Sequence, residues 1–300
     1  MSTTVSGRII AAFGRQYLAE LADGELLVCL TRGKKSEVAC GDQVEVLRTA
    51  AASAQDGAQG VIESTRPRSS LLYRSDAYKQ KLIAANVTQL IVVVAAEPPF
   101  SDELLSRCLI AAHSQQLEVL IVLNKCDLPE LAEAARQQLA PYRAAGYRIL
   151  ELSAKQDAAP LRPLLLGHTS VLIGQSGMGK STLINSLVPD AQAATREISA
   201  VLNAGKHTTT HARLYHLDAD SHLIDCPGLQ MFGLYHLKLE EIEDGFVEFA
   251  PYRGHCRFNN CRHLHEPGCA LQQAAKDGKI SERRLQLFQD IRTDLHQTTY

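Results

Sequence analysis

The sequence has no long apolar run and no large excess of charge of either sign. None of its apolar stretches reaches the ~20 residues that a membrane-spanning helix requires. Its start is rich in Ser and Thr but lacks the basic and apolar segments of a signal peptide. We therefore expect a cytoplasmic protein that makes no contact with a membrane.

The net charge is close to zero, but the charged side chains are unevenly distributed along the sequence. The 300 residues carry a formal net charge of −2. Residues 1–85 contain 11 basic and 9 acidic side chains, residues 86–249 contain 12 and 19, and residues 250–300 contain 8 and 5. Basic ends around an acidic middle are compatible with flanks that contact a polyanion such as nucleic acid. With 45% hydrophobic residues, a chain of this length can bury two or three cores, which predicts a multidomain protein.

The first 75 residues show short alternating segments and no long helical periodicity. Turn signals at Ala22-Asp23-Gly24 and Cys40-Gly41-Asp42 separate these segments, and this pattern predicts a small closed β-barrel. The basic loop Arg32-Gly33-Lys34-Lys35 is either a solvated hairpin tip or a contact to a phosphate backbone. The alternating segments are residues 7–13, 16–21, 25–30 and 43–47, and residues 49–60 are predicted to form a loop.

From Val87 onward, buried strands alternate with helices, which predicts an α/β domain with a parallel sheet. Ser101 is a candidate N-cap for the first helix. The predicted strands are residues 90–95, 117–123, 147–152 and 169–173, with a strand pair at 212–217 and 222–225. The predicted helices are residues 101–115, 129–145 and 182–187.

A phosphate-binding motif occupies the turn between the predicted strand 169–173 and the helix that follows it. Gly174-Gln175-Ser176-Gly177-Met178-Gly179-Lys180-Ser181 fits the pattern G-x-x-x-x-G-K-[ST] at every fixed position. Its glycines let backbone N–H groups approach phosphates closely, Lys180 is expected to reach the β- and γ-phosphates, and the Ser181 hydroxyl is expected to bind Mg²⁺. The alternative is a glycine turn before an ordinary helix, which would need neither the lysine nor the hydroxyl.

Two further motifs follow strands of the same predicted sheet and indicate a guanine base. Asn124-Lys125-Cys126-Asp127 matches N-K-x-D, in which one carboxylate accepts from both N1–H and the exocyclic amine of guanine. Ser153-Ala154-Lys155 matches the S-A-K loop that covers the base. Each motif is weak alone, but both stand at the carboxyl ends of strands, where ligands bind in such sheets.

The segment after the phosphate loop carries residues suited to Mg²⁺ and the γ-phosphate. Asp225-Cys226-Pro227-Gly228 matches D-x-x-G, so we expect Asp225 to bind Mg²⁺ through water and the Gly228 N–H to meet the γ-phosphate. One threonine of Thr208-Thr209-Thr210 is expected to close over Mg²⁺. The alternative for this polar stretch, residues 205–211, is a β-branched surface loop.

Three cysteines and a histidine crowd into fourteen residues near the end of the sequence. The spacing Cys256-x₄-Cys261-x-His263-x₅-Cys269 suits a closed, tetrahedral zinc site, which would be structural because four ligands leave no open position. His255 and His265 are rival ligands. Residues 270–295 show helical spacing, with packing positions predicted at Ile280, Leu285, Leu287, Phe288 and Ile291.

The order of the motifs is unusual, because the guanine motifs precede the phosphate loop. The domain therefore looks circularly permuted, and the segment that follows D-x-x-G becomes a C-terminal extension. A β-barrel, the motif order N-K-x-D, S-A-K, G-x-x-x-x-G-K-S, D-x-P-G, and a C-terminal zinc knuckle together resemble the RsgA (YjeQ) family of bacterial GTPases over essentially the whole chain.

The resemblance implies a specific organisation and activity. It implies an OB-fold RNA-binding barrel at 1–75, a circularly permuted P-loop GTPase domain at 76–240 and a zinc-binding helical domain at 241–300. It also implies a monomer that binds the small (30S) ribosomal subunit through 16S rRNA, acts late in the maturation of that subunit, and hydrolyses GTP to GDP with stimulation by it. Thr209 would be the Mg²⁺ ligand of the threonine segment. The nucleotide-binding residues would be Asn124, Lys125, Asp127, Ser153, Ala154, Lys155, the phosphate loop 174–181, Thr182, Asp225 and Gly228.

The sequence departs from Ras-like GTPases at the position that orients the attacking water. Leu229 follows the D-x-x-G motif where those enzymes carry glutamine, which predicts low intrinsic turnover. We hypothesise that His207 positions the water, with Lys180 and Thr209 as the other catalytic groups; alternatively, the partner supplies the group. Two rival functions are a nucleotide-independent RNA-binding module with a vestigial GTPase and a small-molecule kinase that uses the same loop.

Overall fold

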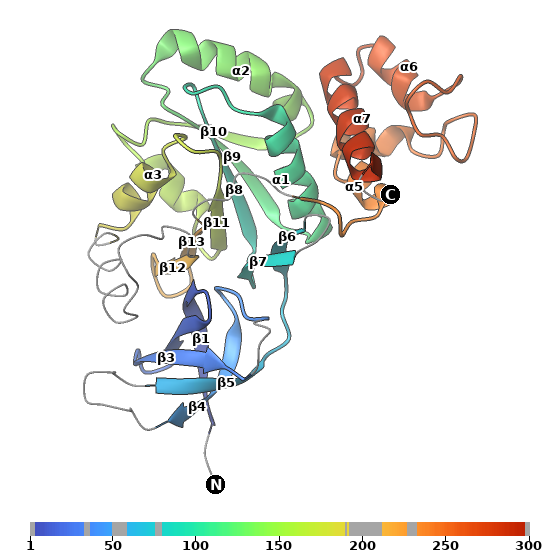
Figure 1. The fold of residues 1–300 in the computed structure, drawn as a ribbon. Helices are drawn as coiled ribbons and strands as arrows, with labels where there is room; N and C mark the ends of the chain where they lie inside the picture. The colour runs from blue at the N-terminus through green and yellow to red at the C-terminus, as the bar shows by residue number, and fades with distance from the viewer. Residues whose placement is uncertain are drawn as a thin grey trace.

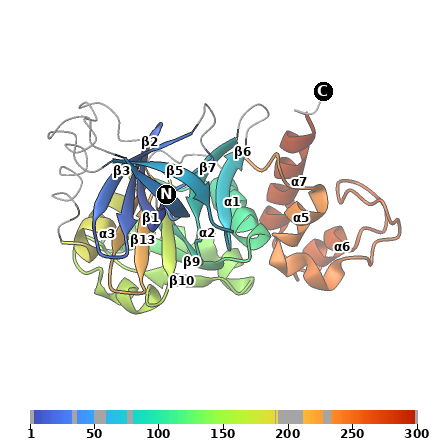
Figure 2. The same ribbon diagram turned by 90° about the horizontal axis from the view of Figure 1, so that it is seen from below.

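The protein has three parts that lie in sequence order along the molecule (Figure 1). The computed structural model describes residues 4–32, 37–49, 59–75, 80–189, 191, 212–226 and 233–297. A barrel lies at the N-terminal end, a larger unit of strands and helices lies in the middle, and a helical unit at the C-terminal end packs beside the middle part (Figures 1 and 2). Within the described residues, no helix has the length and apolarity to cross a membrane.

Five strands close the N-terminal barrel, as predicted. The pairings run β1-β2-β3-β5-β4, and β4 returns to pair with β1, so the barrel has no open edge along the paired residues. The inward side chains include Ile9, Tyr17, Leu27, Val44 and Val46, each no more than 2% exposed. β5 is the strand that alternation alone did not identify. The strands are β1 (Thr4–Phe13), β2 (Gln16–Leu21), β3 (Leu26–Thr31), β4 (Gln43–Thr49) and β5 (Gln59–Thr65).

The middle part is the predicted α/β domain. Its sheet has the order β10-β9-β8-β11-β13-β12, parallel throughout except for the edge strand β12. The predicted N-cap is confirmed, since the Ser101 hydroxyl accepts from the Leu104 N–H at 3.2 Å. The elements are β8 (Gln89–Ala95), α1 (Asp102–Ser114), β9 (Glu118–Asn124), α2 (Pro129–Ala144), β10 (Arg148–Glu151), η1 (Ala159–Leu164), β11 (Thr169–Ile173), α3 (Lys180–Leu187), β12 (Arg213–His216) and β13 (His222–Asp225).

The barrel and the α/β sheet form one continuous sheet, which the sequence did not predict. β4 covers the edge of β1 only as far as Arg8, and beyond it Ala11 pairs with Arg213 of β12. The hairpin of β6 (Leu71–Ser75) and β7 (Gln80–Ala85) lies against the same junction, where Ala85 N–H donates to the Cys40 carbonyl at 2.8 Å. The end of β7 lies very close to Gly41, since a Cβ on Gly41 would lie 2.2 Å from the Ala85 carbonyl oxygen.

The C-terminal part consists of short helices around three phenylalanine rings. The centroids of Phe246, Phe249 and Phe288 lie 5.0–5.5 Å apart. The helical stretch predicted from residue 270 to 295 is divided into two helices, because Gly278, with φ of 68°, ends the first of them. The elements are α5 (Leu239–Asp244), η2 (Val247–Tyr252), α6 (Ala270–Lys276) and α7 (Glu282–Gln297).

Arg284 joins this C-terminal part to the α/β domain. Its side chain is only 2% exposed, and its Nε donates to Glu248 Oε1 at 2.6 Å. Its Nη1 donates to the Ser106 hydroxyl of α1 at 2.8 Å. The guanidinium also lies 4.6 Å from the ring centroid of Tyr142 and 4.4 Å from that of Phe246. One buried cation therefore holds α7 against α1 and α2.

Candidate nucleotide and metal sites

Asn124 connects three loops at the carboxyl edge of the parallel sheet. It stands at the end of β9 and is 1% exposed. Its Nδ2 donates to the Met178 carbonyl of the phosphate loop at 2.9 Å, while its Oδ1 accepts from the N–H groups of Lys125 and Ala154, both at 2.8 Å. The structure thus brings the N-K-x-D, S-A-K and phosphate-loop segments together, although the chain visits them in permuted order.

Two glycines allow the phosphate loop to lie this close to the sheet. Gly179 has φ of 90°, and a Cβ there would lie 2.2 Å from Asn124 Nδ2. Gly174 has φ of 157°, which L residues rarely adopt, and a Cβ there would lie 2.2 Å from the Val93 carbonyl oxygen. Gln175 fixes the other side of the loop, since its Oε1 accepts from the Ser101 N–H at 2.8 Å. These contacts hold the loop at the N-terminus of α3.

Lys180 lies on the phosphate loop itself. Its Nζ donates to the carbonyl oxygens of Gly174 at 2.6 Å and of Gln175 at 2.8 Å. Burial lowers the pKa of Lys180 and raises the pKa of Asp225, and the attraction between these two charges opposes both shifts. Asp225, at the end of β13, pairs in register with Leu172 of β11, two residues before the phosphate loop, so it lies at the same edge of the sheet as Lys180. The side chains of Ser181 and Thr182 are exposed at the start of α3.

The residues expected to contact the base lie at the rim of this edge. Asp127 is exposed, whereas Ser153 and Ala154 are 8% and 5% exposed. The pKa of Asp127 is held below its usual value, chiefly by the Ser153 hydroxyl, and the charges of Lys155 and Lys125 lower it further. An ionised, accessible carboxylate is the group that a guanine base requires here.

Several predicted site residues lie outside the described ranges. These are His207, the threonines Thr208, Thr209 and Thr210, and Gly228 with the neighbouring Leu229. The basic loop of the barrel lies outside them as well, apart from Arg32, which pairs with Glu63 at 2.7 Å. The roles expected of these residues stay predictions.

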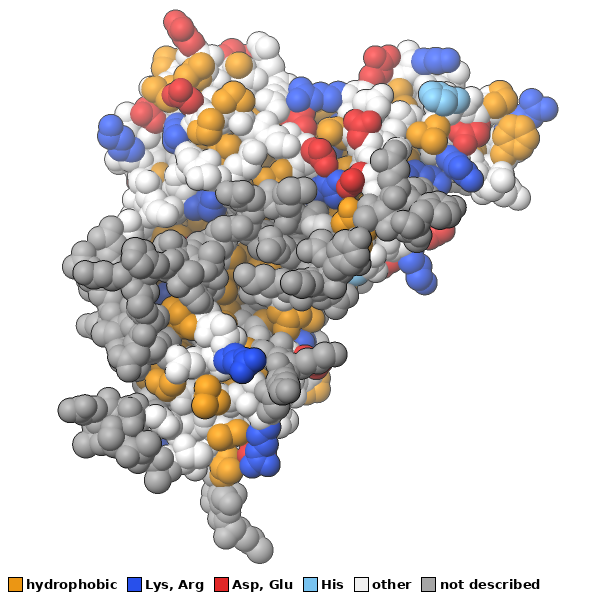
Figure 3. Space-filling view, viewed as in Figure 1, with side chains coloured by type: hydrophobic (Ala, Val, Ile, Leu, Met, Phe, Trp, Pro, Cys, Tyr) orange, Lys and Arg blue, Asp and Glu red, His pale blue; other side chains and the backbone are white. Residues whose placement is uncertain are grey.

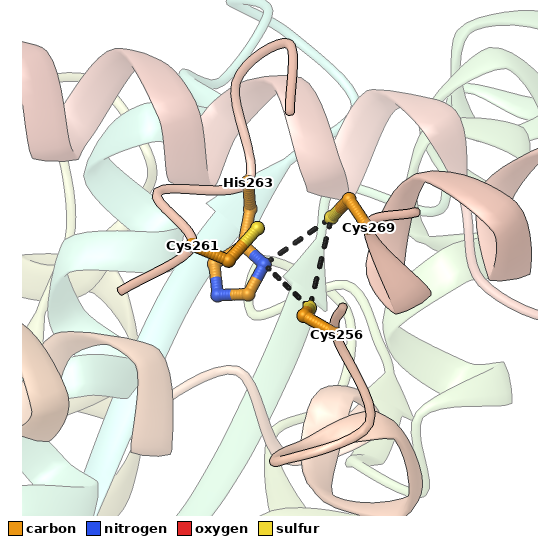
Figure 4. A group of neighbouring side chains, drawn as sticks. All are labelled: Cys256, Cys261, His263 and Cys269. Atoms are coloured by element: carbon orange, nitrogen blue, oxygen red, sulfur yellow. Dashed lines mark hydrogen bonds between the residues drawn. The ribbon is translucent and has the colours of Figure 1, made fainter. Parts of the chain in front are cut away.

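The four predicted zinc ligands converge in the C-terminal part (Figure 4). Their donor atoms all lie within 4.8 Å of one another. His263 Nδ1 lies 3.3 Å from Cys269 Sγ and 3.6 Å from Cys256 Sγ, and the two sulfurs are 4.0 Å apart. A tetrahedral zinc ion would separate such ligand atoms by about 3.5–3.8 Å. The cluster, completed by Cys261, therefore fits one zinc ion, and the rival ligands His255 and His265 are exposed and outside it.

Glu243 orients the histidine of this cluster. Its Oε2 lies 3.3 Å from His263 Nε2, which leaves Nδ1 to face the sulfurs. The hydrogen bond with His263 is the main cause that holds the pKa of Glu243 below its usual value. His263 also has φ of 61°, a strained conformation for a residue with a side chain. Sequence reasoning missed Glu243 because no spacing rule connects α5 with a ligand twenty residues later.

Comparisons with known proteins agree with this geometry. The model of the RsgA GTPase family matches residues 65–235. The small ribosomal subunit biogenesis GTPase RsgA of Nitrosospira multiformis is 56% identical over 295 residues, which cover 98% of this chain and 92% of the relative. The protein of the same name from Burkholderia pseudomallei strain K96243 is 56% identical over 290 residues, 95% of this chain and 90% of the relative.

Solved structures share the fold over nearly the whole chain. The crystal structure of YjeQ from Thermotoga maritima aligns with a TM-score of 0.71 and 28% identity, covering 98% of this chain and 99% of that one. The crystal structure of YloQ, a circularly permuted GTPase, aligns with a TM-score of 0.69 and covers 99% of this chain and 97% of the other. At 24% identity, this second likeness concerns the fold alone.

Proposed function

This chain belongs to the RsgA GTPase family, and we propose that it binds GTP and hydrolyses it to GDP and phosphate during the biogenesis of the small ribosomal subunit. The observation that carries the proposal is the position of Asn124, which ties together the loops that would hold the base and the phosphates. A vestigial site would not need to keep this side chain buried and hydrogen-bonded to both neighbouring loops.

The proposed roles of the site residues follow from their chemistry. Asp127 accepts from the guanine base, with Lys125 and the loop 153–155 beside it. Backbone N–H groups of residues 174–182 surround the phosphates, and Lys180 exchanges its bonds to the loop carbonyls for bonds to phosphate oxygens. Mg²⁺ would be held by Ser181, Asp225 and Thr209, where it neutralises charge on the phosphates.

We propose that turnover is low until the partner binds. Leu229 has no group that orients water, so His207 or the partner must supply one. If His207 is that group, His207→Ala lowers stimulated turnover about 10²-fold or more while nucleotide affinity stays unchanged. Unchanged stimulated turnover in this variant assigns the role to the partner.

The two flanking parts are proposed to contact the ribosomal subunit. The barrel, at 1–75, and the zinc-binding part, at 241–300, flank a GTPase domain at 76–240. Residues 1–75 carry 9 basic and 8 acidic side chains, and residues 250–300 carry 8 and 5, which favours contacts with the phosphates of 16S rRNA. We propose that the protein acts as a cytoplasmic monomer on this subunit.

The test measures GTP turnover with and without purified small ribosomal subunits at fixed salt. We expect slow hydrolysis alone and a large stimulation by the subunits. Lys180→Ala should abolish the stimulated rate, whereas Lys279→Ala, at a lysine that is 61% exposed on the C-terminal part, should leave it unchanged. If Lys180→Ala supports normal subunit maturation in cells, the nucleotide-independent RNA-binding module is correct and this proposal is wrong.

Base specificity is tested by competition. GDP should compete far better than ADP, because adenine offers no donors to the Asp127 carboxylate. Asp127→Asn should weaken GTP binding by about 10²-fold or more, because the amide keeps one acceptor oxygen but loses the charge and turns an NH₂ donor toward the second donor of guanine. Equal competition by ADP would favour the small-molecule kinase.

A further inference from the structure

We propose that the zinc knuckle, residues 254–269, displays a stacking platform for an unpaired base of single-stranded RNA, with Phe258 as the platform. The inference rests on the proposed function, because the small ribosomal subunit would supply that RNA. It assigns a ligand class to a surface of this chain that lies apart from the nucleotide site.

Phe258 is an aromatic side chain that the fold leaves uncovered. It is 43% exposed, and among the residues that the structure describes the other large hydrophobic side chains with high exposure are aliphatic: Leu26, Leu30, Leu131 and Leu166. Its backbone is fixed, since its carbonyl accepts from the Cys261 N–H at 3.2 Å and the Arg257 N–H donates to the Gly268 carbonyl at 3.0 Å. Bases stack well on an aromatic ring that is already held in place.

Two cations beside this ring have no acidic partner among the described residues. Arg257 lies with its guanidinium 5.5 Å from the centroid of the Phe258 ring. Arg257 and Arg262 are both exposed and form no ion pair in the described part of the chain, whereas Arg253 pairs with Glu243 and Asp244. Arg257 beside the ring and Arg262 in the lining of the hollow that Phe258 also lines suit the phosphates on either side of a stacked base.

A hollow of about 500 Å³ adjoins the ring and offers groups that can read a base edge. The amide side chains of Asn259 and Asn260 line it together with Phe258, Arg262 and Arg292. The carboxylates of Glu240 and Glu243 and the zinc ligands Cys256, Cys261 and His263 line it as well, so one part of the hollow is the metal site. Each amide carries both donors and acceptors, which match the edges of an unpaired base. Hydrophobic, basic, acidic and histidine side chains all lie on the outer edge of the C-terminal part (Figure 3).

The surroundings of Phe258 favour RNA over an apolar protein partner. Its sequence neighbours are an arginine and two asparagines, all exposed, so the ring is not part of a run of apolar side chains. A docking site for protein normally needs a contiguous apolar centre. A base needs only one flat ring with cations nearby.

The test uses the fact that the natural sequence contains no tryptophan. Phe258→Trp places one fluorescent ring at the proposed platform of the zinc-loaded full-length chain. Leu166→Trp is the matched control, because Leu166 is 63% exposed outside the knuckle. Single-stranded oligoribonucleotides of each base composition are titrated against both variants, and stacking should quench the tryptophan of the first variant only.

Affinity for small ribosomal subunits completes the test. Phe258→Ala should weaken binding by about 5- to 100-fold, as should Phe258→Leu, because leucine keeps an apolar surface but has no π-face. Phe258→Trp should bind as the natural protein does. Zinc content and turnover without subunits should be equal in all variants, which separates stacking from misfolding.

The inference is overturned if no oligoribonucleotide quenches the fluorescence of Phe258→Trp, or if Phe258→Ala binds subunits normally. It is also overturned if Phe258→Leu binds subunits as the natural protein does while Phe258→Ala does not, because this result would indicate a protein partner. These results differ from failure of the proposed function, in which the natural protein itself shows no stimulation by subunits.

Discussion

Gly179 and Gly146 have nearly the same backbone conformation in different surroundings. Their φ angles are 90° and 92°, but only Gly179 faces another group, Asn124 Nδ2, at 2.2 Å from the site of a Cβ. Around Gly146, no atom lies within 4 Å of that position. The pair therefore separates the cost of backbone strain from the cost of displacing Asn124.

Gly179→Ala should lower GTP affinity by about 10²-fold or more, because Asn124 must move and release the Met178 carbonyl. Gly146→Ala should cost about 1 kcal/mol of stability and leave GTP affinity unchanged. Affinity is measured with a fluorescent guanine nucleotide and stability by urea unfolding. Equal losses of affinity in both variants would contradict the role given to Asn124.

His222 gives the folded protein a predictable response to acid. Burial, followed by the charges of Arg8 and His216, lowers the pKa of His222 from 6.5 to about 4, while Asp218 and Asp220 oppose this shift. His222 Nδ1 lies 3.0 Å from His216 Nδ1, and His216 Nε2 lies 2.8 Å from Glu20 Oε2. The ring, at the start of β13, is thus held neutral where this strand lies near β2 of the barrel.

His222 binds a proton more readily in the unfolded chain than in the folded protein. Its contribution to the unfolding free energy is therefore full above pH 6.5 and is lost as the pH falls toward about 4. Over that range the loss should be about 1–3 kcal/mol of unfolding free energy. His222→Gln should remove it, whereas His255→Gln, at an exposed histidine, should not. Parallel pH profiles for the natural protein and His222→Gln would contradict this assignment.

At the scale of elements, the Arg284 contacts decide whether α7 stays docked. Arg284→Ala should cost about 3–5 kcal/mol, because it leaves Glu248 partly buried without its cation. Arg143→Ala should cost no more than about 1 kcal/mol, since Arg143 is 52% exposed in its pair with Glu151. Urea unfolding of both variants measures these losses of unfolding free energy. Recovery of stability on adding Glu248→Gln to Arg284→Ala would support the reason given, and a loss below 1 kcal/mol in Arg284→Ala would contradict it.

The elements that the sequence predicted are those whose signals are local. The strand 169–173 coincides with β11 because a short apolar run between turn signals defines it, and the adjoining motif fixes its end. The zinc ligands were likewise found from their spacing. Contacts between distant segments carry no such signal: Arg284 and Ser106 are 178 residues apart in the chain, and nothing near either residue indicates the other.

At the scale of the whole molecule, bound zinc should stabilise only the C-terminal part. Removing zinc with a chelator should abolish the protection of backbone amides from hydrogen exchange across residues 239–297, because this part is small and its loop 254–269 depends on the ligands. The barrel and the α/β sheet supply none of the four ligands and should keep their protection. Cys261→Ser should reproduce the effect. Loss of protection in β8 or β9 would show that the metal stabilises the sheet as well.

The pairing of β1 with β12 matters when the GTPase domain is separated from the barrel. A GTPase domain that begins after residue 75 would lack β1, so the Ala212 carbonyl beside β12 would lose the Ala12 N–H that donates to it at 3.2 Å. Open strand edges recruit strands from other chains. We therefore expect the truncated domain to self-associate through this strand edge, which would obscure measurements of its GTP turnover.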